Sequence, residues 1–474
     1  MKSHKLLIDG SWRTARETIP DVNPFTGRTI ARVCVADDSL MDEAVEAAEK
    51  AAASARKLSA HERRQILQGI AAGIGKRREE IARTITAESG KPIAFARAEA
   101  DRSALTFTLA AEEVGRSGGE VIPLDITGAA KGYIGIVRQV PLGPIAAISP
   151  FNFPINLVAH KVAPAIAAGN TVVLKPPSQT PMTALLLGEI AEKAGVPAGL
   201  LNVVPAPVTV ADRLVTDPRI KMLTFTGSPA VGWDMKTRAG KKKVTLELGG
   251  NAGAIVHDDA NLDWAAPRLA LGAFANAGQV CISVQRIYVQ ERVYDAFLKK
   301  FVAHAKKIAV GDPMDEKTVV GPLIDSKAAD RVEAWIAEAR SAGAKVLAGG
   351  RRKGNVIEPT VISDAAREIK VSCLEVFGPV VTLTAYGTFE EAVAAVDDSI
   401  YGLQAGVFTR DIGRIAYAFD HLEVGGVIVN DYPMFRVDNM PYGGVKDSGF
   451  GREGLRYAIQ EMTEPRLLVI NQNV

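Results

Sequence analysis

Residues 145–154 read Ile-Ala-Ala-Ile-Ser-Pro-Phe-Asn-Phe-Pro, a short apolar strand that ends in a turn and leads into a helical stretch. The same order recurs along the chain as far as residue 246. We expect strands at 145–148, 172–174, 201–204, 223–225 and 244–246, and helices between them at 155–168, 181–194, 208–215 and 230–239. Strands that alternate with helices predict a parallel sheet with helices on both faces, and such sheets bind ligands at the carboxyl ends of their strands.

The regions before residue 145 and after residue 246 show other patterns of secondary structure. The first third is expected to be mainly helical, with helices at 40–56, 60–74, 77–88 and 94–114. A second α/β set begins near residue 254, with strands at 254–256, 345–347 and 380–385 and helices at 262–275 and 293–307. Residues 133–140 alternate like a half-exposed strand, and residues 466–470 form an apolar strand suited to pairing with the sheet edge of another chain. A length of 474 residues is too great for one compact core and suits several domains.

The composition is that of an ordinary globular protein, with 47% hydrophobic and 23% charged residues. The formal net charge of +2 offers no electrostatic footprint for nucleic acid. No apolar run is long enough to cross a bilayer, and the first ten residues turn polar before an apolar signal core could form. The three cysteines predict reduced thiols in the cytoplasm. The six histidines show no pairing at metal-ligand spacing, so no metal site is expected.

Four chemically distinctive residues stand in turns of small residues. Cys281 lies in the segment 274–283, Phe-Ala-Asn-Ala-Gly-Gln-Val-Cys-Ile-Ser, and Glu247 ends a strand 34 residues earlier, just before Leu-Gly-Gly-Asn. Asn152 stands in the turn that follows the first strand, and Lys175 ends the second strand ahead of Pro-Pro-Ser. A thiol nucleophile and a carboxylate base are the groups that acyl-thioester chemistry requires.

Taken singly, each of these residues also has a purely structural interpretation. A lone cysteine is more often a small core residue, and this is what we expect for Cys34 and Cys373. Asn152 could cap its turn, and Glu247 could pair with one of the lysines at 241–243. The interpretation as a site therefore depends on the four residues taken together.

In this order and at these spacings, the four residues resemble the aldehyde dehydrogenase family, enzymes that oxidise aldehydes to carboxylic acids with NAD or NADP. The resemblance extends from about residue 7 to about residue 469. It implies an aldehyde dehydrogenase-like α/β fold with three parts. These are a Rossmann-like cofactor-binding domain (1–119 and 141–248), a second α/β catalytic domain (249–455) and a small β element for oligomerisation (120–140 and 456–474). It also implies a homo-oligomer, either a dimer or a tetramer, that acts on a small aldehyde without a nucleic acid or membrane partner.

The resemblance implies a role for three of the four residues. Cys281 attacks the aldehyde carbon to form a thiohemiacetal and then a thioester. The amide of Asn152 and the backbone N–H of Cys281 stabilise the charge that develops on the carbonyl oxygen. Glu247 is the general base that activates the water for hydrolysis of the thioester. We expect backbone amides at a helix start to lower the pKa of Cys281, and burial to raise the pKa of Glu247.

The same resemblance locates the cofactor. Lys175 and Ser178 are expected at the adenosine ribose, where an uncharged Ser178 in place of an NAD-selecting glutamate admits NADP. The turn at 225–231 is expected at the pyrophosphate, while Glu375 and Phe377 are expected at the nicotinamide ribose and ring. The full set of expected cofactor contacts is Ile148, Ser149, Pro150, Phe151, Lys175, Ser178, Phe225, Gly227, Ser228, Val231, Leu248, Glu375 and Phe377.

Three further residues, Arg102, His160 and Arg436, are expected to bind the substrate at one funnel. Two guanidinium groups and an imidazole suit a carboxylate, phosphate or phosphonate. This set resembles the lactaldehyde, phosphonoacetaldehyde and non-phosphorylating glyceraldehyde-3-phosphate dehydrogenase branches. Asp438 could instead neutralise Arg436, and the cations could form surface or interface salt bridges, so a broad or apolar specificity stays open.

Two alternatives belong to other functional classes. A cofactor-independent thiol esterase would use Cys281 as its nucleophile but leaves Lys175 and Glu375 without a role. A non-catalytic binding protein on the same fold would tolerate the loss of Cys281 or Glu247, and both residues are present. The sequence therefore favours the dehydrogenase.

Overall fold

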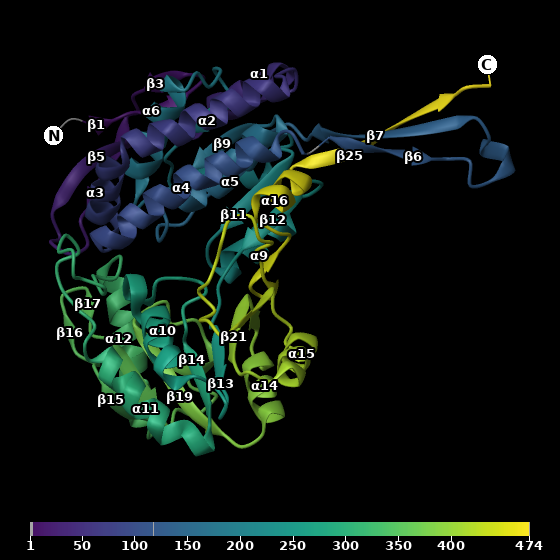
Figure 1. The fold of residues 1–474 in the computed structure, drawn as a ribbon. Helices are drawn as coiled ribbons and strands as arrows, with labels where there is room; N and C mark the ends of the chain where they lie inside the picture. Colours follow the sequence, from purple (N-terminus) through teal and green to yellow (C-terminus); the bar gives the residue numbers. More distant parts are fainter. Residues whose placement is uncertain (1–2, 117, 474) are drawn as a thin grey trace.

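The computed structural model of the protein describes residues 3–116 and 118–473. Two lobes, each built from a sheet and helices, lie one above the other, and a long β arm projects sideways from the upper lobe (Figure 1). The amino terminus lies at the opposite side of the molecule from the arm, and the carboxyl terminus lies at the far end of the arm. None of the helices in the described residues is long and apolar enough to span a membrane.

The upper lobe contains an eight-stranded sheet in the order β24-β12-β11-β8-β9-β10-β2-β3. Its five central strands are parallel and confirm the expected alternation: β8 (Pro144–Ile148), β9 (Thr171–Lys175), β10 (Leu201–Val203), β11 (Met222–Thr226) and β12 (Lys243–Glu247). β9 and β10 lie on one side of β8, and β11 and β12 lie on the other. The strand order therefore reverses at β8, and ligands of such sheets bind outside the carboxyl ends of the strands at the reversal.

Helices cover both faces of this sheet. One face packs against α5 (Asn156–Ala168) and α6 (Pro181–Lys193), and α2 (Ala60–Lys76), α3 (Arg78–Ser89) and α4 (Ile93–Glu113) form an outer layer over these two helices. The other face packs against α1 (Asp38–Ala55) and α9 (Pro229–Arg238). Side chains of β8 alternate between the two cores, with Ile145 and Ala147 in the first and Ala146 and Ile148 in the second. Burial on both faces is the reason that these strands read as continuous apolar runs.

The amino-terminal region differs from the expectation of mainly helical structure. Residues 3–35 form five short strands: β1 (Ser3–His4), β2 (Leu6–Ile8), β3 (Ser11–Arg13), β4 (Glu17–Val22) and β5 (Thr29–Val35). β1, β2 and β3 have only two or three residues, too few for a clear period, and β2 also pairs with the distant strand β10. β4 and β5 pair with each other. The expected helix at 208–215 is also divided, into α7 (Val208–Ala211) and α8 (Arg213–Thr216). The N–H of Val215 bonds to the carbonyl of Asp212, only three residues back, which interrupts the α-helical ladder.

The lower lobe contains a seven-stranded sheet in the order β15-β18-β19-β14-β13-β21-β22. Its strands are β13 (Gly253–Val256), β14 (Arg286–Gln290), β15 (Lys345–Ala348), β18 (Thr360–Ser363), β19 (Val380–Tyr386), β21 (Gln404–Phe408) and β22 (Gly426–Val429). One face packs against α10 (Leu262–Phe274), α11 (Glu291–Ala305) and α12 (Ser326–Ser341), and the other against α14 (Phe389–Asp397) and α15 (Ile412–His421). The α/β fold class predicted from the sequence is thereby present in both lobes.

The chain returns to the upper lobe near its carboxyl end. β24 (Gly449–Phe450) pairs antiparallel with β12, and α16 (Leu455–Glu461) packs Leu455 and Ile459 into the core around α5. The segment that precedes β24 therefore lies beside the carboxyl end of β12. Small elements complete the fold: α13 (Lys370–Cys373), β16 (Arg352–Lys353), β17 (Val356–Ile357), β20 (Tyr401–Gly402), β23 (Val445–Lys446) and the 3₁₀ turn η1 (Gly128–Ala130).

The arm is a three-stranded sheet in the order β25-β7-β6, formed by β6 (Gly119–Pro123), β7 (Tyr133–Pro141) and β25 (Thr463–Asn471). β25 pairs along its whole length with β7 of its own chain, from Thr463 opposite Pro141 to Asn471 opposite Tyr133. Among the described residues its other edge carries no strand. The four apolar side chains at 467–470 are between 41% and 56% exposed, so the arm presents apolar surface to solvent.

The packing of α2 against the first core yields a stability prediction. Ile70 on α2 is fully buried, so Ile70→Ala removes buried methyl groups and leaves a cavity. We expect the free energy of unfolding to fall by about 2–5 kcal/mol. Ile412→Ala is the matched control, because Ile412 on α15 is 78% exposed, and its change should stay within about 0.5 kcal/mol. Equal losses in the two variants, measured by urea unfolding, would contradict the assigned core.

Candidate active site

Cys281 lies in a loop between the 3₁₀ turn η2 (Ala275–Gly278) and β14. The turn is unusual because Asn276, Ala277 and Gly278 all have positive φ angles, of 53°, 55° and 68°. Two consecutive non-glycine residues in the left-handed region store strain, and such strain is concentrated at functional sites. The side-chain amide of Gln279 holds the turn by donating to the carbonyl of Asn276 at 3.3 Å.

Glu247 is the last residue of β12 and opens the turn that faces this loop. A Cβ at Gly250 would collide with the carbonyl oxygen of Cys281, so only glycine permits this approach of the two backbones. Asn152, in the turn after β8, reaches the same loop: its Nδ2 donates to the carbonyl of Gln279 at 3.0 Å. The structure therefore brings the nucleophile loop together with the predicted base and the predicted amide.

Tyr442 completes the centre and was given no role on sequence grounds. Its hydroxyl lies 3.2 Å from Sγ of Cys281, with either atom able to donate. The guanidinium carbon of Arg436 lies 3.5 Å from the centroid of the Tyr442 ring. The next residue, Gly443, borders Glu247, since a Cβ there would lie 3.0 Å from Oε1. The only sequence signal was the Pro-Tyr-Gly-Gly turn itself, which is local, whereas the contact with Cys281 is tertiary.

Burial sets the protonation of the thiol and of the carboxyl group. It raises the pKa of Cys281 to about 12, and the hydrogen bond from Tyr442 opposes the rise. The expectation that a helix start lowers this pKa is wrong, because the loop after η2 leads into a strand and not into a helix. Burial, reinforced by the negative charge of Glu453, raises the pKa of Glu247 well above its usual value, as expected. Neither oxygen of Glu247 has a hydrogen-bond partner among the described residues, which leaves both available to a water molecule.

The carboxyl ends of β8, β9 and β11 carry polar side chains: Ser149 follows β8, Lys175 ends β9 and Thr226 ends β11. The hydroxyls of Ser149 and Thr226 are buried there and lack hydrogen-bond partners within the described chain. Lys175 is 8% exposed, and burial lowers its pKa. Ser228, the N-cap residue of α9, makes no side-chain capping bond, so the first amides of the helix are free to bind an anion. These groups fit a dinucleotide. Its ribose hydroxyls would supply hydrogen-bond partners for the buried hydroxyls and for Lys175, and its pyrophosphate would accept from the amides at the start of α9.

Glu375 and Phe377 reach these strand ends from the lower lobe. Oε1 of Glu375 accepts the N–H of Gly250 at 3.0 Å, and burial raises the pKa of Glu375 to about 7. Phe377 has a φ of 47°, a strained value for a bulky residue, and its ring packs edge-on against Phe151 at 5.8 Å. The structure thus brings these two predicted contacts to the turn after β12.

The remaining expected cofactor residues occupy the same strand ends. Ile148, Phe225 and Leu248 are at most 6% exposed, so the core holds their side chains. Exposed positions at the rim are Ser178, Ser228 and Val231, with Pro150 and Gly227 half-buried beside them. The predicted set is therefore contiguous, but its buried members are placed to act through their backbones.

A cavity of about 260 Å³ ends on Cys281. Its lining includes Arg102, Arg436 and the aromatic residues Phe95, Phe153, Tyr432 and Tyr442. Nε of Arg102 donates to Asp438 at 2.9 Å, and Nη2 of Arg436 donates to Glu453 at 3.0 Å. Asp438 thus pairs with Arg102 and not with Arg436. Neither of these two carboxylates lines the cavity, whereas both guanidinium groups do. The lining also contains Glu99, which forms a buried ion pair with Lys91 of the same lining.

His160 does not belong to this lining, contrary to expectation. It is 2% exposed and lies behind Arg436, with Nε2 3.1 Å from Asp438. Burial and the charge of Arg436 lower its pKa, so the imidazole is neutral and adds no positive charge. Its position on α5 turns it into the protein, because every residue of that helix is buried.

Lys161 and Glu453 form a buried ion pair that the sequence did not suggest. Nζ of Lys161 lies 3.3 Å from Oε1 of Glu453. Although burial by itself raises it, the charges of Lys161 and Arg436 bring the pKa of Glu453 down to about 2. Glu453 therefore stays ionised beside Glu247 and keeps the pKa of that carboxyl group high.

Comparison with known proteins gives consistent results over nearly the full length. The chain matches the model of the aldehyde dehydrogenase family over residues 12–468. It is 44% identical to 3-sulfolactaldehyde dehydrogenase of Priestia aryabhattai over 99% of this chain and 98% of the relative. It is also similar to two crystal structures. Aldehyde dehydrogenase 21 from Physcomitrella patens, in complex with the reaction product succinate, has 48% identity, a TM-score of 0.98 and coverage of 100% and 99%. Glyceraldehyde-3-phosphate dehydrogenase GapN from Methanocaldococcus jannaschii, complexed with NADP, has 40% identity, a TM-score of 0.93 and coverage of 96% and 99%.

The contact between Tyr442 and Cys281 predicts a change in thiol reactivity. Tyr442→Phe removes the hydroxyl that stabilises the thiolate, so alkylation of Cys281 by iodoacetamide near pH 8 should slow about five- to tenfold. Since the pKa is about 12, the rate in the parent protein should rise about tenfold per pH unit without a plateau below pH 10. Tyr432→Phe, in the same cavity, should leave the rate unchanged. An unaltered rate in Tyr442→Phe, with Cys281 modification followed by peptide mass spectrometry, would refute the contact.

Proposed function

This chain belongs to the aldehyde dehydrogenase family, and on that premise we propose that it oxidises a small anionic aldehyde to its carboxylic acid. The predicted family and fold class are both confirmed, and the chain is an NAD(P)-dependent oxidoreductase that acts on aldehydes. Its matches cover almost the whole length on both sides, so the family's activity is assigned to the complete chain.

The proposal of an anionic substrate rests on one observation: two guanidinium groups face the cavity that ends on Cys281, and their carboxylate partners lie behind them. Arg102 is 28% exposed at its side chain, whereas that of Asp438 is only 1% exposed. Arg436 also lines the cavity, but its side chain is only 7% exposed, and that of its partner Glu453 is 3% exposed. A ligand in the cavity therefore meets the positive side of each pair, and a charge-assisted bond to a carboxylate, sulfonate or phosphate is favourable there. His160 makes no contribution to this charge.

Some of the relatives support the same substrate class, whereas others are named lactaldehyde dehydrogenase, after an aldehyde without an acidic group. The names 3-sulfolactaldehyde dehydrogenase and glyceraldehyde-3-phosphate dehydrogenase each denote an aldehyde with an acidic group, and succinate is a dicarboxylate product. We propose that the acidic group of this chain's substrate lies at Arg102 and Arg436 while its aldehyde carbon lies at Cys281. A cavity of about 260 Å³ limits the substrate to a few carbon atoms.

Each residue of the centre has its own step in the proposed reaction. The thiol of Cys281 loses its proton to solvent, and Sγ then forms a bond to the aldehyde carbon. Nδ2 of Asn152 and the N–H of Cys281 stabilise the oxyanion of the thiohemiacetal. NAD or NADP, when bound at the strand ends, supplies the acceptor for the hydride that leaves this carbon. Glu247 takes a proton from the water that attacks the resulting thioester, and its raised pKa makes its carboxylate a stronger base than an exposed one. The C–S bond breaks, the acid is released and the thiol is restored.

Cofactor choice and assembly are part of the proposal. Lys175 supplies a cation at the adenosine ribose, and exposed Ser178 places no negative charge against a 2′-phosphate, so NADP is accepted. We assign homo-oligomer formation to the arm, because a second copy would cover the exposed side chains of Val469 and Ile470 and the open edge of β25. Three free cysteines without a disulfide suit the cytoplasm.

Two substitutions separate the steps. Glu247→Gln should form the acyl-enzyme, seen as a burst of about one reduced cofactor per site, and then turn over about a hundredfold or more slowly. Cys281→Ala should give no burst but retain cofactor binding, followed by fluorescence of the reduced cofactor. Cys373→Ser, a thiol outside the site, should behave as the parent. A steady wild-type rate in either of the first two variants would contradict the assigned roles.

A substrate panel tests the anion pocket. Arg102→Gln should lower kcat/KM for succinic semialdehyde about 10- to 100-fold, because a charge-assisted bond is lost, and should lower kcat/KM for propanal less than about threefold. Arg97→Gln on the same helix lies outside the cavity and pairs with Glu79, so it controls for a general loss of charge. Faster oxidation of neutral than of anionic aldehydes by the parent enzyme would rule out the pocket.

A further inference from the structure

A second cavity, of about 690 Å³, lies where the arm joins the upper lobe. Its helical wall is the turn between α1 and α2, with the end of α5, and its other wall is formed by β7 and β25. It shares no lining residue with the cavity at Cys281. Its size lies within the range of small-molecule sites.

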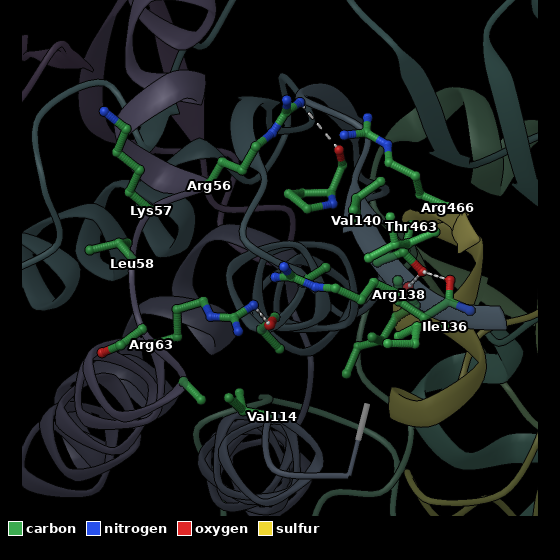
Figure 2. Close-up of a pocket in the computed structure, with 18 of the residues that line it drawn as sticks. Arg56, Lys57, Leu58, Arg63, Val114, Ile136, Arg138, Val140, Thr463 and Arg466 are labelled. Atoms are coloured by element: carbon green, nitrogen blue, oxygen red, sulfur yellow. Dashed lines mark hydrogen bonds between the residues drawn. The ribbon is translucent and has the colours of Figure 1, made fainter. Parts of the chain in front are cut away.

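Five cationic side chains and no acidic side chain line this cavity: Arg56, Lys57, Arg63, Arg138 and Arg466. In the described part of the chain, no carboxylate oxygen lies within 4.0 Å of any of them. Glu464, two residues before Arg466, is bound by Lys243 at 2.6 Å. In Figure 2 the four arginine side chains are directed into the cavity from both walls, whereas Lys57 points away. Packing of the helices or of the arm does not require these unpaired cations to lie together, so their convergence indicates a ligand.

The register of the arm concentrates this charge. Arg138 on β7 stands directly opposite Arg466 on β25. Like charges at directly opposed positions of an antiparallel pair destabilise the sheet. Pairing of β25 with β7 continues along nine residues without a shift, so the register itself does not force a positive residue at both positions. The repulsion between Arg138 and Arg466 therefore lowers the stability of the arm, and a bound anion would offset this loss.

The helical wall holds its cations in place. Nη1 of Arg63 donates to the carbonyl of Ala167 at 2.7 Å, while its Nε is buried and has no partner in the described chain. Nη2 of Arg56 donates to the carbonyl of Pro141 at 3.5 Å. Each guanidinium is thus anchored through one N–H and keeps other N–H groups for a ligand, which is the preorganisation that phosphate recognition uses.

We propose that this cavity is a binding site for a small phosphate-bearing polyanion. The anion bridges Arg56 and Arg63 on the body to Arg138 and Arg466 on the arm, so its binding ties the arm to the upper lobe. Phosphate chemistry is favoured because four planar guanidinium groups present paired donors to tetrahedral oxyanions. The near-neutral net charge of +2 argues that the basic residues serve one local ligand and not a nucleic acid.

The test is isothermal titration of the full-length enzyme with inorganic pyrophosphate, at saturating NADP⁺ so that the cofactor site is filled. We expect saturable binding of one pyrophosphate per chain. The double variant Arg138→Gln/Arg466→Gln should weaken it about tenfold or more, because two charge-assisted contacts are lost. The matched control Arg16→Gln/Arg28→Gln removes two exposed arginines that line none of the cavities described above and should bind as the parent.

Thermal unfolding provides a second measurement that separates binding from a structural role. Without anion, Arg138→Gln/Arg466→Gln should melt at or above the temperature of the parent, since a like-charge pair is relieved. With pyrophosphate, only the parent and the control should gain stability. Unchanged pyrophosphate binding in the double variant would overturn the proposal. A lower melting temperature of that variant without anion, or a loss of its oligomeric state on sedimentation, would overturn it as well, by assigning the arginines to the fold or to contacts between copies.

Discussion

The chemistry of this molecule depends on one close approach between two backbones. The turn after β12 lies so near the loop of Cys281 that a side chain at Gly250 would strike the carbonyl oxygen of residue 281. β12 belongs to the sheet of the upper lobe, and the loop leads into the sheet of the lower lobe, so this contact sets the nucleophile against the strand ends where a dinucleotide fits. No side-chain rotation can relax a contact between backbone atoms, and the same contact places Glu247 and Asn152 beside the thiol.

Charge around the centre is organised by burial. Asp438 and Glu453 are buried carboxylates, yet each is held ionised by cations, and truncating one member of such a pair would leave an uncompensated charge. Glu247 is the exception, because it is buried without a partner in the described residues and its pKa rises. Two different environments at one centre thus turn one carboxyl group into a structural anion and the other into a candidate base.

The arm has surface features that do not stabilise a single chain. Its apolar side chains at 467–470 are open to solvent, and its opposed arginines repel each other. Both features have a physical cost in the isolated chain. They indicate partners outside it: a second copy for the apolar face and an anion for the basic cavity.

Local patterns in the sequence determined the α/β class, the five central strands of the first sheet to within one residue, and the turns that carry Cys281, Glu247, Asn152 and Lys175. This was possible because apolar runs buried on both faces, bounded by Gly and Pro, are a property of neighbouring residues. β1, β2 and β3 escaped prediction because two or three residues show no clear period, and β2 also depends on pairing with the distant strand β10.

Only the tertiary structure decided how charged and polar groups meet. Tyr442 bonds to a thiol 161 residues away, and Arg102 pairs with a carboxylate 336 residues away. His160 and Arg436 were both expected in the funnel, but burial of α5 on all sides places the imidazole behind the guanidinium. These contacts arise because the chain crosses between the lobes a second time before β24, and no local pattern of residues encodes where such a crossing lands.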